Sequence, residues 1–267
     1  MCAKLNQVLS RLVPDGPVKE AFTSSYYSLY YNRKHFRENG FRVNYKKGHF
    51  TYGFDDGVSF ASYENMADEL KRSLRGYLAK YSLKKGDIVV DCGAYIGEFA
   101  LYAARAVGPA GAVIAFEPDP TIFGKLKANV MLNGLENVVM VNKGAWSADG
   151  VLQFVGDNVR GYSFMFADKG EGAIDIPVAS LDNELERLGV KKVDFIKIDV
   201  EGAELELIKG AEKTLRGNDV KAAIASYHVV DGKKACAEVE RMFRSLGYAA
   251  ATAHPQHLTT YAWKDRK

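Results

Sequence analysis

The stretch DIVVDCGAYIGEF, residues 87–99, constrains the fold of this chain more than any other. Its apolar run 88–90 is too short for a helix and rich in β-branched residues, which predicts a buried parallel strand. Asp91 closes that strand, and Gly93 and Gly97 bracket a tight turn before a helix. Glycine lets the backbone turn sharply and approach a ligand closely. A strand, a glycine turn and a helix N-terminus together form the ligand-binding corner of a doubly wound α/β sheet.

The residues of the turn do not favour a dinucleotide. A dinucleotide fingerprint has glycine at the first, third and sixth positions, and these positions hold Gly93, Tyr95 and Glu98. The turn carries an acid on each side, Asp91 and Glu98, and contains no Lys or Arg. Such a turn suits a cationic or zwitterionic ligand better than a diphosphate. S-adenosylmethionine, with its sulfonium and amino groups, is a ligand of this kind.

A second acid supports an adenosyl cofactor. The apolar run 112–116 predicts the second strand, and Glu117-Pro118 follows it directly. An acid at this strand end can accept hydrogen bonds from both ribose hydroxyls of an adenosine. The series of strand, Asp, glycine turn, helix, strand and Glu therefore predicts S-adenosylmethionine binding. The alternative is a Rossmann-like domain with an empty or repurposed pocket.

Three segments of the chain resemble the FkbM-type S-adenosylmethionine-dependent methyltransferases, namely VVDCGAYIGEFALYAA, AFEPDP and FIKIDVEGAELELIKGA. The resemblance covers roughly residues 84–264, and DVEGAE, residues 199–204, is its most specific part. It implies a class I methyltransferase fold and, usually, O-methylation of a sugar or another small hydroxylated molecule.

The predicted fold is α/β, a Rossmann-like class I methyltransferase with a mostly parallel seven-stranded sheet and a terminal antiparallel hairpin. Beyond the two strands above, apolar runs alternating with helices predict strands at 138–141, 193–198, 220–226, 248–252 and 258–263. Residues 1–82 are expected to form an N-terminal extension of helices and a β-hairpin (41–54), and residues 83–267 the cofactor-binding domain. In this fold, ligands lie at the carboxyl ends of strands one and four.

The expected cofactor-binding residues lie at the exits of the first four strands. They are Asp91, Gly93, Ala94, Tyr95, Gly97, Glu117, Pro118, Ala145, Trp146 and Asp199. We expect Asp199 to face the methionine end of the cofactor. The turn that holds Ala145 and Trp146 flanks the adenine in this fold, although a role for Trp146 in the core stays equally open.

Three residues are candidates for catalysis: Asp199, His228 and Glu201. A hydroxyl acceptor must lose its proton to a base, and a histidine titrates near neutral pH. We therefore expect His228, just past the fifth strand, to be that base, with Glu201 next in line; the alternative is a histidine on a surface loop. The family often places an acid two residues before this histidine, where Ser226 stands. Lys197, which alternates with Asp199 along the strand, is interpreted as an ion-pair partner.

The sequence favours no metal, because metal-dependent O-methyltransferases surround a hard cation with carboxylate or amide oxygens and no Asp-Asn pair follows the fifth strand. The histidine pair His254 and His257 is interpreted as part of a proline-containing turn.

The net charge of +3, from 36 basic and 33 acidic side chains, is too balanced to indicate nucleic-acid binding. Three scattered cysteines, no signal core and no apolar run near ~20 residues favour a cytoplasmic protein without a membrane segment.

The sequence thus predicts an S-adenosylmethionine-dependent methyltransferase that acts on oxygen of a small hydroxylated metabolite or sugar. Methylation of nitrogen or of a macromolecule is one alternative, although no Asn-Pro-Pro-Tyr-like motif follows the fourth strand. A cofactor-binding module without catalysis is the other alternative. A homodimer formed through the N-terminal extension also stays open.

Overall fold

The computed structural model describes residues 16–34, 41–46, 48–156, 164–166, 173–230, 233–253 and 258–265. The chain divides into two compact units, residues 1–71 and residues 72–267. The helix α4 (Ala67–Tyr77) runs through the boundary between them. Residues 72–82, which the sequence analysis assigned to the N-terminal extension, group with the second unit.

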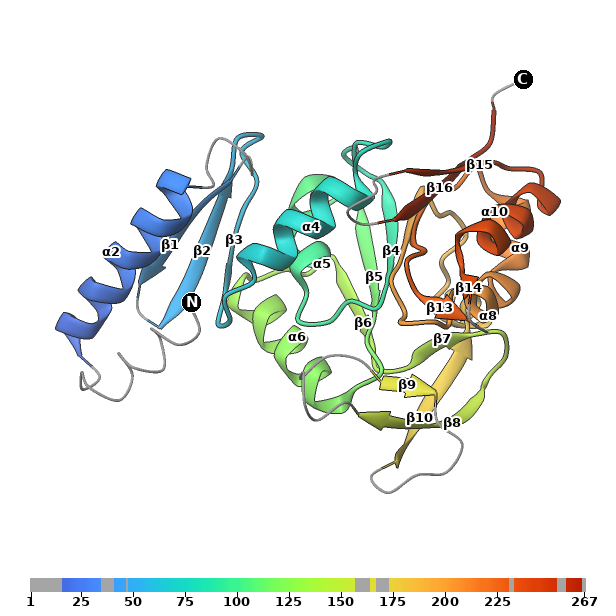
Figure 1. Ribbon diagram of the computed structural model, residues 1–267, viewed down its shortest axis with the longest axis horizontal. Coiled ribbons are helices and arrows are strands. Elements are labelled where there is room, and N and C mark those ends of the chain that lie inside the picture. The colour runs from blue at the N-terminus through green and yellow to red at the C-terminus, as the bar shows by residue number, and fades with distance from the viewer. Residues whose placement is uncertain are drawn as a thin grey trace. The chain divides into compact units, whose positions relative to one another are not determined.

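The first unit combines a helix with a three-stranded antiparallel sheet (Figure 1). Its elements are α2 (Pro17–Lys34), β1 (Phe41–Lys46), β2 (His49–Phe54) and β3 (Ser59–Ser62). The strands β1 and β2 pair from Phe41–Phe54 to Lys46–His49, which confirms the predicted hairpin. Alternate residues of the sheet, including Val43, Tyr52 and Phe60, are buried, as the period of two along a strand requires. The strand β3 was not predicted, because SFAS is short and only weakly patterned.

The second unit is built on a seven-stranded sheet with the order β15-β16-β12-β11-β4-β5-β6. The strands are β4 (Ile88–Cys92), β5 (Ala112–Phe116), β6 (Val138–Val141), β11 (Phe195–Ile198), β12 (Lys221–Ala225), β15 (Ala249–Ala253) and β16 (Thr259–Trp263). Pairing is parallel from β12 through β6, and β16 runs antiparallel to both β12 and β15. The predicted mostly parallel sheet with its terminal hairpin is confirmed. The residues that join the hairpin, including His254 and His257, lie outside the described residues.

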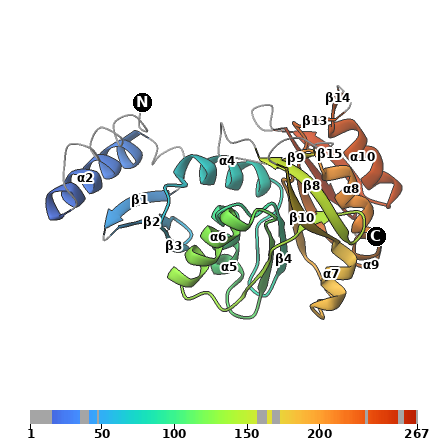
Figure 2. The ribbon, with the colours of Figure 1, turned by 90° about the horizontal axis from the view of Figure 1, so that it is seen from below.

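Helices cover both faces of this sheet, as Figures 1 and 2 show. One face carries α5 (Glu98–Val107) and α6 (Pro120–Leu132), and the other carries α8 (Glu204–Gly210), α9 (Glu212–Gly217) and α10 (Cys236–Ser245). Apolar residues of the strands, such as Val90, Ile114 and Ile196, are buried between these layers. The sheet is therefore covered on both sides, which is the arrangement that near-continuous apolar strands favour.

A smaller four-stranded sheet, ordered β7-β10-β8-β9, follows β6 in the chain. It contains β7 (Gly144–Trp146), β8 (Gly150–Gly156), β9 (Phe164–Phe166) and β10 (Ala173–Ser180), and α7 (Leu181–Arg187) leaves it. The side chain of Ser180 accepts a hydrogen bond from the backbone N–H of Asn183 and so caps α7. A short hairpin of β13 (Val229–Val230) and β14 (Lys233–Lys234) precedes α10. None of the helices in the described ranges has the length and apolar character that crossing a membrane requires.

The order of the large sheet reverses between β4 and β11. The chain proceeds from β4 outward to β6 on one side, and later from β11 outward on the other side. Ligands of open α/β sheets bind in the crevice at the carboxyl ends of the strands where the order reverses. The loops that leave β4 and β11 are therefore the first place to look for a site.

Candidate active site

The loops that leave β4 and β11 touch each other at Gly93. A Cβ atom added to Gly93 would lie 1.8 Å from the carbonyl oxygen of Asp199, and Gly93 has φ of +80°. The contact excludes a Cβ atom there, and the left-handed backbone further favours glycine. Glycine is therefore required at the first position of the predicted turn, because the loop after β11 occupies the space that a side chain would need.

A buried ion pair lies under this contact. Lys197 of β11 places Nζ 2.8 Å from Oδ1 of Asp91, and the side chains are 1% and 0% exposed. The same ammonium donates a 2.5 Å hydrogen bond to the carbonyl oxygen of Gly93. Burial alone would lower the pKa of Lys197, but the carboxylates of Asp91 and Asp199 raise that pKa above its ordinary value. The interpretation of Lys197 as an ion-pair partner is confirmed, and cofactor binding by Asp91 stays a prediction.

The carboxylate of Glu117 organises the ends of β4 and β5. Its Oε2 accepts a 2.8 Å hydrogen bond from the backbone N–H of Tyr95, and its Oε1 accepts a 3.0 Å hydrogen bond from that of Asp119. Burial raises the pKa of Glu117 to about 7, although the two hydrogen bonds oppose this rise. Asn142 donates to the carbonyl oxygens of Glu117 and Pro118 at 2.8 and 3.1 Å. The role of Asn142 was not predicted, because a single asparagine after a strand carries no motif.

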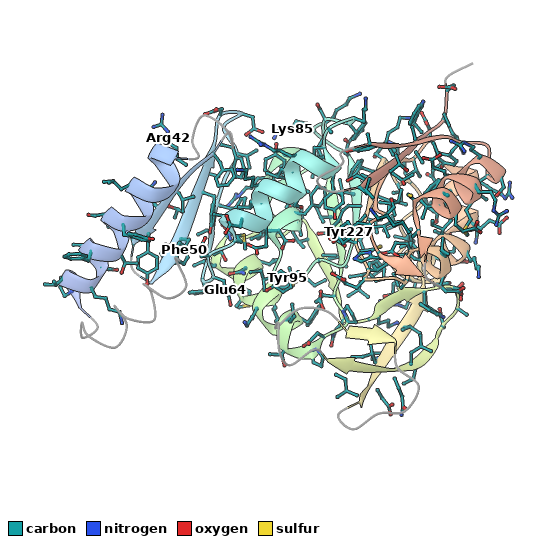
Figure 3. The ribbon with its side chains drawn as sticks, in the orientation of Figure 1. Arg42, Phe50, Glu64, Lys85, Tyr95 and Tyr227 are labelled. Carbon is teal, nitrogen blue, oxygen red and sulfur yellow. The ribbon has the colours of Figure 1, made fainter. Side chains whose placement is uncertain are left out.

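The remaining predicted cofactor residues lie in the turn after β4 and in β7. Tyr95, labelled in Figure 3, has φ of 51°, a left-handed conformation that is rare outside glycine. The backbone N–H of Ala94 donates a 2.8 Å hydrogen bond to the carbonyl oxygen of Phe116. Gly97, with φ of 99°, caps α5 at its N-terminus. Ala145 is buried in β7, and Trp146 packs against the pair Ile176 and Val178 of the small sheet. Binding of a cofactor by these residues stays a prediction.

Two tyrosines hold the carboxylate of Asp199. The hydroxyl of Tyr77 donates to Oδ2 at 2.7 Å, and the hydroxyl of Tyr227 donates to Oδ1 at 3.3 Å. Tyr77 ends α4 and is completely buried, and burial and the nearby carboxylate raise its pKa well above the ordinary value. Tyr227, labelled in Figure 3, follows β12 and stood next to a predicted site residue. No signal in the sequence indicated Tyr77.

His228 lies between two carboxylates. Its Nδ1 is 2.7 Å from Oε1 of Glu204, and its Nε2 is 3.0 Å from Oε2 of Glu201. Burial lowers the pKa of His228, but the contacts with Glu201 and Glu204 outweigh it and raise the pKa to about 10. This direction of the pKa shift favours a protonated ring near neutral pH, whereas the sequence led us to expect a base that titrates there. Glu201 itself has φ of 51°, a second left-handed residue other than glycine.

The structure brings together the three predicted catalytic residues. One ligand atom each of Asp199, Glu201 and His228 lies within 4.8 Å of the others. Asp199 and Glu201 come from the loop after β11, and His228 comes from the loop after β12. The catalytic roles of these residues stay predictions. The sequence favoured a site without metal. These three side chains are nevertheless of kinds, and close enough together, that they could hold a metal ion.

Comparisons with known proteins identify the family of this chain. The family described as "Methyltransferase FkbM domain" matches residues 91–250. Methyltransferase sdnD of Sordaria araneosa is 30% identical over 164 residues, which cover 49% of this chain and 63% of that protein. The 31-O-demethyl-FK506 methyltransferase FkbM of Streptomyces tacrolimicus is 26% identical over 197 residues, covering 62% of this chain and 74% of that protein. This chain thus spans a little under two thirds of the first of these relatives.

Among solved structures, methyltransferase FkbM from Methylobacillus flagellatus superimposes with a TM-score of 0.50 at 21% identity, over 68% of this chain and 44% of that chain. This likeness shows the fold. The family match covers the loops of β4, β5, β11 and β12 that form the candidate site, and it extends over more than half of the chain. The chain therefore belongs to the FkbM methyltransferase domain family.

Proposed function

We propose that this protein is an S-adenosylmethionine-dependent methyltransferase that methylates an oxygen of a small hydroxylated metabolite or sugar. The observation that carries the proposal is the meeting of the β4 and β11 loops: the backbone of Asp199 lies against Gly93, and one ligand atom each of Asp199, Glu201 and His228 lies within 4.8 Å of the others. Family membership supports methyl transfer. The relative named as a 31-O-demethyl-FK506 methyltransferase supports oxygen as the accepting atom.

The residues of the loops fit an adenosyl cofactor. Each oxygen of Glu117 accepts one backbone hydrogen bond, and a carboxylate oxygen has a second lone pair that can accept from a ribose hydroxyl. The turn 93–97 contains no Lys or Arg that would bind a diphosphate. When bound, the cofactor supplies a methyl group on a positively charged sulfur. The carboxylates of Asp199 and Glu201 favour that positive charge at the end of β11.

The protein's own part in the reaction is to position the acceptor and to handle its proton. The acceptor hydroxyl gains a methyl group and loses a proton, which a nearby group must receive. His228 is already protonated at neutral pH, because its pKa is raised to about 10. In our account His228 therefore holds Glu201 and Glu204 in place. Glu201, with 40% of its side chain exposed, is the carboxylate first in line to receive the proton.

The experiment that tests this function is transfer of a radiolabelled methyl group from S-adenosylmethionine to a panel of sugars, hydroxylated small molecules and amines. We expect label in a product that resists mild alkali, as an ether does and an ester does not. Glu201→Gln should lower the transfer rate. Glu186→Gln is the matched control, because Glu186 makes an exposed ion pair with Lys213. Transfer to amines alone, or equal rates in the parent and Glu201→Gln, would contradict the proposal.

A further inference from the structure

Asp199, Glu201 and His228 are three side chains of the kinds that bind transition metals. They come from two loops, and one ligand atom of each lies within 4.8 Å of the others. Bonds of about 2.1 Å from one ion to imidazole and carboxylate ligands put neighbouring ligand atoms about 3 Å apart. The distance of 3.0 Å between Nε2 of His228 and Oε2 of Glu201 already matches that separation.

The surroundings of His228 provide a second and independent observation. Its Nδ1 lies 2.7 Å from Oε1 of Glu204, a side chain with no exposed surface. Metal-bound histidines almost always donate their other ring N–H to a carboxylate or carbonyl group, which fixes the ring and makes the binding nitrogen more basic. Glu204 is placed for that role. It also accepts a 3.1 Å hydrogen bond from the backbone N–H of Gly202.

Two buried polar atoms at this place have no hydrogen-bond partner among the described residues. One is Nε2 of His228, whose close contact with Glu201 lacks the geometry of a hydrogen bond. The other is Oε2 of Glu204. A buried polar atom without a partner costs free energy and calls for an explanation, such as a bound ion. Nε2 is the nitrogen that lies 3.0 Å from Oε2 of Glu201.

Asp199 keeps the capacity to bind an ion. The hydroxyls of Tyr77 and Tyr227 donate to its two oxygens, and a carboxylate oxygen has a further lone pair beyond one such bond. These hydrogen bonds hold the carboxylate in one orientation. Binding of the ion displaces the proton of His228, and the two carboxylates then balance the charge of a divalent cation. One imidazole and two carboxylates suit a first-row transition metal better than Mg²⁺, which prefers oxygen ligands and water.

We propose that Asp199, Glu201 and His228 bind a divalent transition-metal ion, with Glu204 orienting the histidine. The ion's place in catalysis rests on the methyltransferase function proposed above: a bound divalent ion lowers the pKa of a coordinated hydroxyl. With the ion bound, Glu201 is a ligand and no longer receives the acceptor's proton, which passes to water as the carbon–oxygen bond forms and the carbon–sulfur bond breaks. The proposal departs from the expected metal-free site, which rested on the loop after the fifth strand alone.

The test is a titration of the EDTA-stripped protein with Mn²⁺ at mildly alkaline pH, in which the free ion is measured by electron paramagnetic resonance. The parent should bind roughly one ion per chain, as a single three-residue site predicts. Glu201→Gln should weaken binding at least about tenfold, and Glu204→Gln should weaken it by about 10- to 100-fold. Because Glu201 is 40% exposed, Glu201→Gln is expected to fold like the parent. Circular dichroism checks the fold of each variant.

Glu186→Gln is the matched control, since it removes the same charge from an exposed pair with Lys213, and its Mn²⁺ affinity should equal that of the parent. The visible d–d absorption of Co²⁺ should appear when the ion binds to the parent. This absorption should shift or weaken in His228→Gln, because the nitrogen ligand is lost. Absence of Mn²⁺ and Co²⁺ binding in the parent would overturn the site, and so would equal affinity in the parent and Glu201→Gln. S-adenosylhomocysteine binding, measured separately on the stripped protein, distinguishes a failed metal site from a failed methyltransferase assignment.

Discussion

The hydroxyl of Tyr77 donates a 2.7 Å hydrogen bond to Oδ2 of Asp199, a residue 122 positions later in the chain. The contact joins the end of α4 to the loop after β11. Because Tyr77 is buried beside a carboxylate, its pKa is raised and its hydroxyl keeps the proton that it donates. The orientation of Asp199 in the candidate site therefore depends on a residue outside the matched family region.

Tyr77→Phe should lower the free energy of unfolding by about 1.5–3 kcal/mol, because a carboxylate loses a hydrogen-bond donor. It should also weaken S-adenosylhomocysteine binding at least about threefold, if Asp199 faces the methionine end. Urea denaturation and titration calorimetry measure the two effects. Tyr81→Phe is the control, since it removes a similar 2.9 Å bond to Asp87. An identical change in affinity for both variants would contradict a specific role of Tyr77.

The buried pair of Lys197 and Asp91 predicts a large asymmetry between variants. Lys197→Met leaves the Asp91 carboxylate buried without its partner, and breaking a buried pair in this way costs about 3–5 kcal/mol. The double variant with Asp91→Asn removes both charges and should recover part of that loss. Urea denaturation of the parent, Lys197→Met and the double variant measures their free energies of unfolding. A double variant less stable than Lys197→Met would show that the charges are not coupled as described.

The raised pKa of Glu117, about 7, predicts a pH dependence of cofactor binding. Ribose hydroxyls donate to the carboxylate form, so binding favours loss of the proton. Affinity for S-adenosylhomocysteine should therefore rise between about pH 6 and about pH 8 and level off above the pKa. Calorimetry in buffers of different ionisation enthalpy should detect a proton released on binding at pH values near or below the pKa. In Glu117→Gln the affinity should be lower and independent of pH in this range; a slope that persists would assign the titration to another group.

Two glycines offer a matched comparison of loop and helix. Gly93→Ala places a Cβ atom 1.8 Å from the Asp199 carbonyl oxygen in a left-handed backbone, and the fold should be severely destabilised. Gly124 lies in α6 with nothing within 4 Å of its added Cβ atom, so Gly124→Ala should stabilise the protein by about 0.5–1 kcal/mol. Thermal denaturation compares the two. A Gly93→Ala protein that melts like the parent would exclude the close contact of the two loops.

Local patterns in the sequence predicted the strands of the large sheet well. The apolar runs 112–116 and 138–141 coincide with β5 and β6, because a run of β-branched and apolar residues between turns has few other places in an α/β fold. The turn after β4 was also predicted, since its glycines and acids are contiguous. These features are determined by residues that are adjacent in the sequence, so a single segment of the sequence is enough to predict them.

The properties that depend on distant residues could not be predicted in the same way. The pKa of His228 is set by Glu201 and Glu204, which belong to the loop and helix after β11. The expectation of a metal-free site stays untested; it rested mainly on the loop after the fifth strand, whereas the group that could hold an ion also takes Asp199 and Glu201 from the loop after β11. Tyr77 reaches Asp199 only through the packing of α4. Folding brings these side chains together, and no pattern in one segment contains that information.

The central claim, that the crevice between the β4 and β11 loops binds S-adenosylmethionine, is tested most directly by calorimetric titration with S-adenosylhomocysteine. Hydrogen bonds to a charged acceptor contribute about 1.5–3 kcal/mol each. We therefore predict saturable binding by the parent, at least tenfold weaker binding by Glu117→Ala with unchanged folding, and no comparable binding of NAD. Tight binding of NAD, or the same affinity for S-adenosylhomocysteine in the parent and Glu117→Ala, would contradict the account.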